Sequence, residues 1–186
     1  MDRKADFIPM LQKIFFKKIF IPFLSILLFC SMAGCAAAPS AAGKEDSFPG
    51  SYTVPEGWVK AESHSTEDKF FYVEEGHEND GFPDNISIEA GTNRYAEEEH
   101  EKFRDAILYQ LAAQLQNVDA ELTGDGTYTE QGYVVYIFTV LEKGMVTKQY
   151  YIVGDQRYCL IHLTNFTGSD EAYEAAQEMA DSFVWN

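Results

Sequence analysis

The sequence predicts an α+β domain in which a mostly antiparallel sheet of about six to seven strands packs with two helices. Several short segments alternate apolar and polar residues, which is typical of strands with one buried face. Two longer segments repeat apolar residues at the spacing of an amphipathic helix. The last strand segments are separated by short, glycine-containing breaks, which favour hairpins and therefore antiparallel pairing.

Three short strands are expected before the first helix. Residues 52–54 form the first, and residues 55–58 (PEGW) then turn the chain and return Trp58 toward the core. Residues 69–74 (KFFYVE) and 85–90 (NISIEA) form the next two. The last of these alternates isoleucine and alanine with serine and glutamate, which predicts a sheet with one wet face.

The first predicted helix covers residues 95–116. Its apolar stripe recurs every four residues, at Phe103, Ile107, Leu111 and Leu115. Glutamates crowd its first turns, where the helix dipole favours negative charge. Asn93 is the expected N-cap, because asparagine side chains accept hydrogen bonds from the free N–H groups of a first turn.

Four further strands are expected in an antiparallel meander. They cover residues 120–128, 133–141, 145–153 and 157–164. The segment YVVYIFTVL at 133–141 is apolar on both faces, which indicates a central strand covered from each side.

A second helix is expected at the end of the chain, over residues 169–183. Alanines, Met179 and Phe183 form its buried stripe. Thr167 and Asp170 stand three residues apart, which is the spacing of a capping box.

Residues 52–183 show three features of one known superfamily. Pro55-Glu56-Gly57-Trp58 forms the first turn, a helix follows the third strand, and Ser182-Phe183 closes the last helix. In this layout the chain resembles the PsbP-like superfamily, which includes an extrinsic photosystem II subunit, a nuclear-import protein and many bacterial lipoproteins. The resemblance implies an α/β/α sandwich with mostly non-enzymatic binding or assembly roles. It supplies no catalytic motif, and photosystem or nuclear-import roles do not fit the leader described next.

The N-terminal segment has the pattern of a lipoprotein signal peptide. Lys13, Lys17 and Lys18 precede an apolar run at 19–32, which is short for a membrane span of roughly 20 residues. The run ends in Met32-Ala33-Gly34-Cys35, which resembles the lipobox of bacterial lipoproteins. The resemblance implies cleavage before Cys35 and attachment of diacylglycerol to its sulfur, with palmitate as a usable label. Two acyl chains suffice for stable anchoring.

The expected organisation is a signal peptide at 1–34, a lipidated cysteine with a flexible tether at 35–51, and a single α+β domain at 52–186. The protein is then lipid-anchored at the cell membrane, on the extracytoplasmic side. An ordinary secretory signal, cut after Ala33 or Ala37, is the alternative. Translation beginning at Met10 instead of Met1 would give a more compact leader.

The negative charge of the mature chain argues against polyanionic partners. The full chain carries 14 basic and 30 acidic residues, and the leader holds five of the basic and two of the acidic ones. Residues 35–186 therefore carry 9 basic and 28 acidic residues, a net charge of −19. Such a surface repels nucleic acid and anionic lipid, so the attached lipid must supply the anchoring. A cationic protein, a metal ion or a neutral ligand would be a compatible partner, but the charge is explained more simply by solubility alone.

Two clusters resemble metal sites but lack the required spacing. Residues 74–80 (EEGHEND) gather carboxylates around His77, and such oxygen ligands suit Ca²⁺ or Mn²⁺. The calcium-loop pattern is missing, so a solvated loop is favoured. His100 lies among glutamates at a helix start, but Arg104 stands where a zinc protease needs its second histidine. No metal or cofactor site is therefore predicted.

Cys159 and His162 are the only candidates for a catalytic pair. They are an odd number of residues apart on one predicted strand, so their side chains point to opposite faces. Cys159 shares its face with Ile161 and Leu163, which indicates a buried thiol. No catalytic residue is predicted, and the chain is not expected to be an enzyme.

The sequence favours a non-catalytic binding or assembly module for an envelope protein partner. Tyrosine is dense in the folded part, and an exposed tyrosine cluster is expected to form the interface. The tyrosines concerned are Tyr95, Tyr109, Tyr128, Tyr133, Tyr136, Tyr150, Tyr151, Tyr158 and Tyr173. A ligand- or cation-binding lipoprotein that uses the 74–84 loop and exposed tyrosines is the alternative, and a small hydrolase is the third hypothesis.

Overall fold

A computed structural model describes residues 48–186; the expected signal peptide, Cys35 and most of the tether lie outside this range. The strands are β1 (Gly50–Ser51), β2 (Trp58–Lys60), β3 (Lys69–Glu74), β4 (Asn85–Thr92), β5 (Ala120–Tyr128), β6 (Val134–Glu142), β7 (Met145–Gly154), β8 (Arg157–Asn165) and β9 (Val184–Trp185). The helices are the 3₁₀ turn η1 (Glu97–Glu99), α1 (His100–Gln114) and α2 (Asp170–Asp181).

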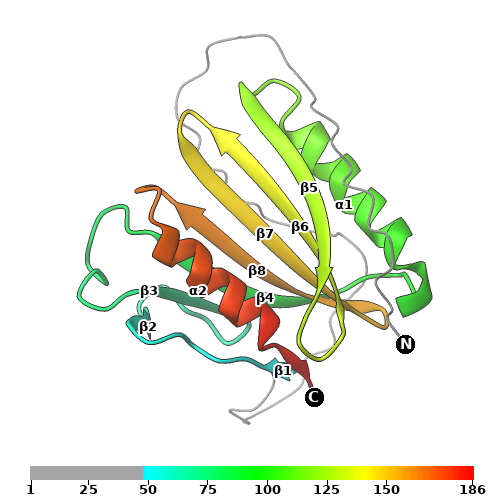
Figure 1. Cartoon of the computed structure of the whole chain (residues 1–186), viewed down its shortest axis with the longest axis horizontal. Helices are drawn as coiled ribbons and strands as arrows, with labels where there is room; N and C mark the ends of the chain where they lie inside the picture. Colours follow the sequence, from blue (N-terminus) through cyan, green and yellow to red (C-terminus); the bar gives the residue numbers. More distant parts are fainter. Residues whose placement is uncertain (1–47) are drawn as a thin grey trace, which may run out of the picture.

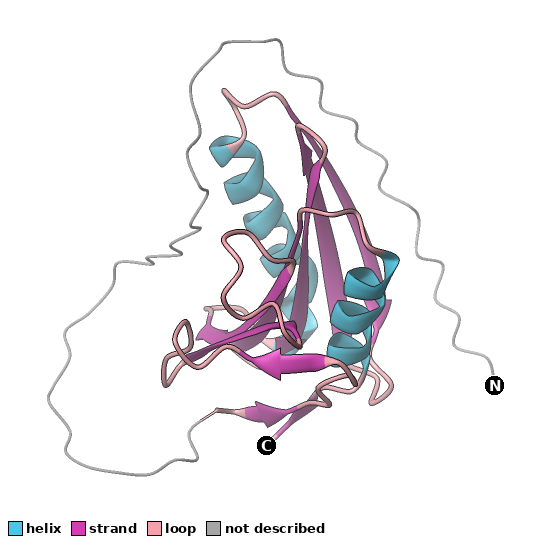
Figure 2. Cartoon of the chain, turned by 90° about the vertical axis from the view of Figure 1, so that its left-hand side faces the viewer, coloured by secondary structure: helices cyan, strands magenta, loops and turns pink. Residues whose placement is uncertain are grey.

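Seven of the strands form one twisted antiparallel sheet in the order β2-β3-β4-β8-β7-β6-β5 (Figure 1). Helix α1 covers one face and α2 covers the other, so the described part of the chain has three layers (Figure 2). Strands β1 and β9 make a separate two-stranded pair, in which Gly50 lies opposite Trp185. The predicted α+β class is confirmed. Within residues 48–186, no helix is long and apolar enough to cross a membrane.

Strict alternation along the strands builds a separate core on each face. Under α2, Ile88 of β4, Tyr150 of β7 and Ile161 of β8 are fully buried with the alanine stripe of the helix. Under α1, Phe138 of β6 and Phe103 of the helix belong to one buried cluster, in which both rings pack against Tyr151 of β7. Because each core is supplied by alternate residues of the same strands, the sheet must be covered on both sides.

The two helices are offset from each other across the sheet. Helix α1 packs over the β5–β8 half of its face, with Phe103, Ile107 and Leu111 buried there. Helix α2 lies on its face chiefly over β8 (Figure 1), and its last residue, Asp181, accepts a backbone hydrogen bond from Glu130 of the β5–β6 connection. On the α2 face, no helix of the described chain covers the start of β5 and the end of β6, and Leu141 near the end of β6 is 42% exposed.

The first strands differ from the prediction. Residues 52–54 do not form a strand: β1 lies at Gly50–Ser51, the last two residues of the expected tether, and β2 begins at Trp58. The segment between them is held by side chains instead. The Tyr52 hydroxyl lies 2.8 Å from the Tyr72 hydroxyl, and Ser182 Oγ accepts from the Thr53 amide. Side-chain contacts so distant in sequence leave no periodic signal.

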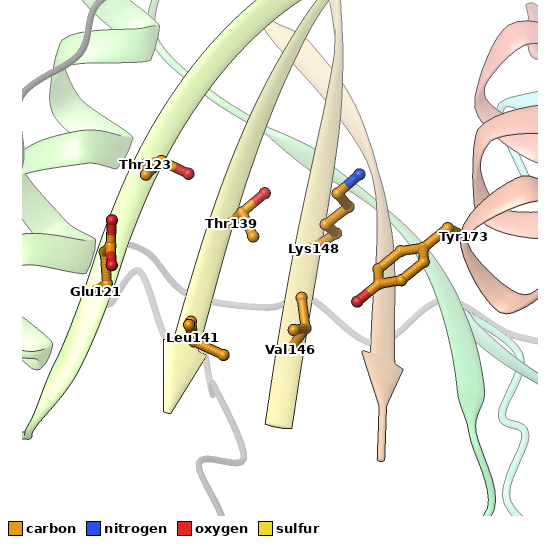
Figure 3. Close-up of a pocket in the computed structure, with 7 residues that line it drawn as sticks. All are labelled: Glu121, Thr123, Thr139, Leu141, Val146, Lys148 and Tyr173. Atoms are coloured by element: carbon orange, nitrogen blue, oxygen red, sulfur yellow. The ribbon is translucent and has the colours of Figure 1, made fainter. Parts of the chain in front are cut away.

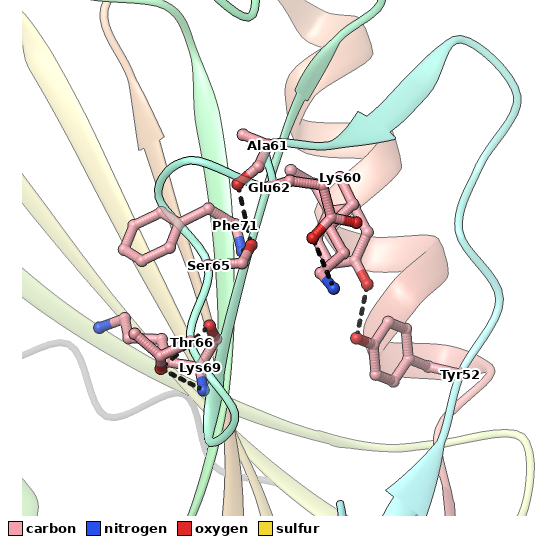
Figure 4. Close-up of polar contacts among 9 residues, drawn as sticks. Tyr52, Lys60, Ala61, Glu62, Ser65, Thr66, Lys69 and Phe71 are labelled. Carbon is pink, nitrogen blue, oxygen red and sulfur yellow. Dashed lines mark hydrogen bonds and ion pairs between the residues drawn. The ribbon is translucent and has the colours of Figure 1, made fainter. Parts of the chain in front are cut away.

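Hydrogen bonds of one serine hold the two ends of the β2–β3 connection together (Figure 4). Ser65 Oγ donates to the carbonyl of Ala61 and accepts from the amide of Phe71. The ion pair between Lys60 and Glu62 adds a 3.1 Å contact at the start of this loop.

Both predicted helix caps were wrong. Asn93 Oδ1 accepts from the amide of Tyr95, which makes a local turn, and the chain passes through η1 before α1 begins at His100. For α2 the cap is Ser169, whose hydroxyl accepts from the amide of Glu171. Thr167 is engaged elsewhere, because its hydroxyl donates to Asp84.

The meander was predicted closely, with one error of position. Strands β5 to β8 pair antiparallel in chain order, as the glycine-containing breaks indicated. Strand β6 is next to the edge strand, however, and β8 is the middle strand. Strand β6 is apolar on both faces because it contributes to both cores, which a strand one place from the edge can also do.

Candidate functional site

The open half of the α2 face contains two adjoining hollows that share Lys148 and Tyr173. The first encloses about 350 Å³ and is lined by Glu121, Thr123, Thr139, Leu141, Val146, Lys148 and Tyr173 (Figure 3). The second encloses about 630 Å³ and is lined by Thr53, Glu130, Lys148, Tyr150, Tyr173, Glu174, Gln177, Glu178, Asp181 and Ser182. Together these residues define what we call the α2 groove.

Strand register brings the lining residues of the first hollow into two rows. Thr123, Thr139 and Lys148 lie side by side across β5, β6 and β7. The neighbouring row contains Glu121 and Leu141. Tyr173 reaches over from α2 and forms the opposite wall (Figure 3). The groove therefore has a mixed floor of threonine and apolar side chains, with a helix along one side.

The second hollow is strongly acidic. Glu174, Glu178 and Asp181 lie three or four residues apart along α2, so they share one side of the helix. Glu130, from the β5–β6 connection, adds a fourth carboxylate, and Lys148 is the single cation among the lining residues. Like charges at this spacing destabilise an isolated helix by a few tenths of a kcal/mol. The arrangement concentrates negative potential in an open concave surface.

Tyr150 lies at the floor of the second hollow with an unmet hydrogen bond. Its side chain is fully buried, and its hydroxyl has no hydrogen-bond partner among the described residues. Burial, with the nearby Asp181 and Tyr173, raises the pKa of Tyr150 to about 12, so the hydroxyl stays protonated. Leaving such a group unpaired costs about 1–3 kcal/mol. Nearby, Lys148 Nζ lies 5.0 Å from the centre of the Tyr173 ring, a cation–π contact.

The 74–84 loop is exposed around its histidine. His77 Nδ1 lies 2.7 Å from Asp80 Oδ2, and this hydrogen bond raises the pKa of His77. Within residues 48–186, no group of three histidine, cysteine or acidic side chains is placed to hold a metal ion. At the other candidate cluster, His100 Nδ1 lies 2.7 Å from the Tyr136 hydroxyl, and Glu99 pairs with Lys102.

Cys159 and His162 point to opposite faces, as predicted. Cys159 is fully buried under α2 with Ile161 and Leu163. His162 faces the α1 side, where its register partners are Ser87 of β4 and Gln149 of β7. The two side chains therefore do not form a nucleophile–base pair.

The expected exposed tyrosine cluster is not present in the described residues. Tyr136, Tyr150 and Tyr151 are buried in the cores, while Tyr109 on α1 is 79% exposed and Tyr128 on β5 is 46% exposed. Most of the tyrosines serve packing. The acidic side of α2 was missed, although its signal was present in the sequence: glutamates at 174 and 178 lie off the buried alanine stripe.

The sheet with one helix on each face is similar to the fold of a solved PsbP protein. The solution structure of cyanobacterial PsbP (CyanoP) from Synechocystis sp. PCC 6803 is similar, with a TM-score of 0.50 and 13% sequence identity. The similarity covers 83% of this chain and 99% of that chain. At this identity the likeness concerns the fold alone. No family model matches the sequence, and no curated protein matches it in sequence either.

Proposed function

We propose that this chain is a lipid-anchored, extracytoplasmic, non-catalytic binding module that captures a basic segment of an envelope protein in the α2 groove. The observation that carries the proposal is the charge of the second hollow, where four carboxylates oppose one lysine on an open concave surface. Complementary potentials of this kind raise association rates and select among partners. The net charge of −19 on residues 35–186 acts in the same direction.

The placement of the reactive side chains supports a non-catalytic role. Cys159 is buried under α2, and His162 lies on the other face of the sheet. His77 is exposed and hydrogen-bonded to Asp80. None of these side chains lines the α2 groove. A shallow, open surface with a polar rim suits a protein partner better than it suits a small substrate, which enzymes usually enclose.

Crosslinking in intact cells tests this function. A photoreactive residue placed at Thr123 or Glu178, on the groove, should give protein adducts, while one placed at Tyr109, on the exposed side of α1, should not. Adducts that are equally strong from Tyr109, or that come only from residues 36–51, would contradict the proposal. So would a hydrolytic activity of the purified chain.

Lipid anchoring rests on Cys35 and has its own test. Replacing Cys35 by serine removes the sulfur that would carry the diacylglycerol, so Cys35→Ser should leave an uncleaved precursor that incorporates no labelled palmitate. Ala37→Ser serves as the control and should be processed and labelled normally. A Cys35→Ser chain that is processed and labelled like the parent would show that the lipoprotein interpretation is wrong.

The second candidate is a cation-binding function, which the acidity of the hollow suggests although no three of its carboxylates, all within the described residues, are placed to hold a metal ion. A tight metal site would raise the melting temperature through binding to the folded state. We expect little change in melting with millimolar Ca²⁺ or Mn²⁺. A rise of many degrees that is lost in Asp181→Asn would favour the cation-binding function instead.

A further inference from the structure

We infer that the floor of the α2 groove is a subsite for one arginine side chain, and that Tyr150 is its specificity-determining residue. The inference rests on the proposed function, because it names the part of a basic partner that the groove recognises. The guanidinium would donate to the Tyr150 hydroxyl oxygen and to the carboxylates of Asp181 and Glu178, which line the same hollow.

The Tyr150 hydroxyl is placed for a ligand. Its register neighbours are Ile137 of β6 and Ile161 of β8, whose apolar side chains offer it no hydrogen bond. It lies close enough to Asp181 for the carboxylate to raise its pKa, yet no described residue bonds it. A donor that enters the hollow supplies the missing bond and removes the cost of an unpaired buried group.

Asp181 is already oriented. Gln177 Nε2, one turn earlier in the helix, lies 3.0 Å from each of its carboxylate oxygens, so the carboxylate is fixed at the last residue of α2. A fixed carboxylate beside an unpaired hydroxyl matches a planar, multi-donor cation. Arginine presents five N–H donors in a rigid plane, whereas lysine presents a compact, strongly hydrated ammonium.

The charges around the floor exclude other ligands. An anion would meet the four carboxylates of the second hollow, and the one lysine there is engaged with the Tyr173 ring. A neutral ligand would leave these carboxylates unused. A side chain is a better match than a free cation, because the first hollow continues the groove past Thr139 and gives room to flanking peptide backbone.

The test uses a defined probe and the full chain, purified in the form that the cell makes. The pentapeptide acetyl-Gly-Gly-Arg-Gly-Gly-amide is titrated by calorimetry, alongside its lysine and citrulline counterparts. The arginine peptide should bind, the lysine peptide should bind several-fold more weakly, and the uncharged citrulline peptide should not bind measurably. With tyrosine labelled at ¹³Cζ, the Tyr150 resonance should shift on binding, because that carbon reports hydrogen bonding at the hydroxyl.

Two variants separate recognition from folding. Tyr150→Phe removes only the hydroxyl and should weaken the arginine peptide about tenfold, the usual value of a hydrogen bond to a charged group. Its melting temperature should not fall, since the lost hydroxyl is unpaired. The matched control, Tyr109→Phe on the opposite layer, should bind like the parent. Asp181→Asn should weaken binding as well, with the loss concentrated on the arginine peptide.

The inference is overturned if Tyr150→Phe binds the arginine peptide as tightly as Tyr109→Phe does, or if the citrulline peptide binds equally well. Either result, together with crosslinks from Thr123 and Glu178, would leave the binding function standing and remove only the arginine subsite. Loss of the groove crosslinks would contradict the proposed function itself.

Discussion

His162 is a buried histidine on the α1 side of β8 whose ring is held neutral. Burial, aided by the positive charge of Lys69, lowers the pKa of His162 to about 4, and its Nε2 has no partner among residues 48–186. Lys69 in turn pairs with Glu89 at 3.1 Å, so the neighbourhood of the ring already contains a satisfied ion pair. Protonating this ring therefore opposes folding.

This burial makes stability depend on pH. Between the folded pKa of about 4 and the ordinary value of 6.5, the unfolded chain binds a proton at His162 that the folded chain does not. Stability should therefore fall as pH drops through this window, by roughly 3 kcal/mol in total. In His162→Gln the unfolding free energy should fall less between pH 7 and pH 4.5, as measured by urea titration. The exposed His64→Gln control should follow the parent, and parallel curves for all three proteins would refute the assignment.

Cys159 is the free thiol among the described residues, and it should be inert. It is fully buried, and burial raises the pKa of its thiol well above the usual range, so little thiolate forms. A maleimide should modify Cys159 only after denaturation. Fast labelling of the folded chain, followed by mass spectrometry of the peptide, would place the thiol on an accessible surface.

At this scale, alternation predicts the face of a residue but not its partners. The spacing of Cys159, Ile161 and Leu163 was enough to place all three in one core. No sequence pattern indicates that the Tyr150 hydroxyl is unpaired, because whether a buried hydroxyl finds a hydrogen-bond partner depends on side chains from other elements. Sequence periodicity carries no information about those contacts.

At the scale of elements, one carboxylate joins two connections that are far apart in sequence. Asp84, at the end of the β3–β4 loop, accepts from the amides of Phe166 and Thr167 and from the Thr167 hydroxyl. These groups belong to the β8–α2 connection, so Asp84 fixes the start of α2. The exposed ring of Phe82 packs edge-on against Phe166 beside this junction.

Removing the Asp84 carboxylate should destabilise the fold. Asp84 is only 7% exposed, so Asp84→Ala leaves two amides and a hydroxyl without their acceptor, at a cost of about 3 kcal/mol. Asp84→Asn keeps one carbonyl acceptor and should lose less. The measurement is the midpoint of urea unfolding. Asp68→Ala, in the exposed β2–β3 loop, is the control, and an Asp84→Ala midpoint equal to that of the control would contradict this role.

Element types were more predictable than element ends. The β6–β7 hairpin could be predicted because its break contains Gly144, and glycine is the usual signal of a two-residue turn. In the structure both turn residues, Lys143 and Gly144, have positive φ. The caps at Asn93 and Thr167 were wrong because a nearby turn and Asp84 compete for those side chains. Local spacing cannot rank such competitors.

For the whole molecule, the position of α2 creates the candidate site. Its alanine stripe lets it sit closely over β8, and the rest of that face is left open toward β5. The sequence indicated a helix and its buried stripe, but the place where a helix rests on a sheet is set by the packing of both surfaces together. The groove was therefore beyond sequence reasoning, while the acidity of the chain was not.

That acidity should act on partner capture in two separable ways. The net charge attracts any basic partner, whereas the carboxylates of α2 concentrate the potential in the groove. The association rate of a basic peptide should fall about tenfold from low to physiological salt, because the screening length shortens to about 8 Å.

Two double variants that remove the same charge distinguish these contributions. Glu174→Gln with Glu178→Gln neutralises the groove wall, and Glu97→Gln with Glu98→Gln neutralises exposed glutamates of η1, ahead of the helix on the other face. Stopped-flow measurements with a fluorescent arginine-rich peptide should show slower association and faster dissociation for the groove pair. The η1 pair should change the association rate only slightly and leave dissociation unchanged, because its charge acts at long range and is screened. Equal effects of the two pairs would mean that net charge alone attracts the peptide and that α2 provides no docking surface.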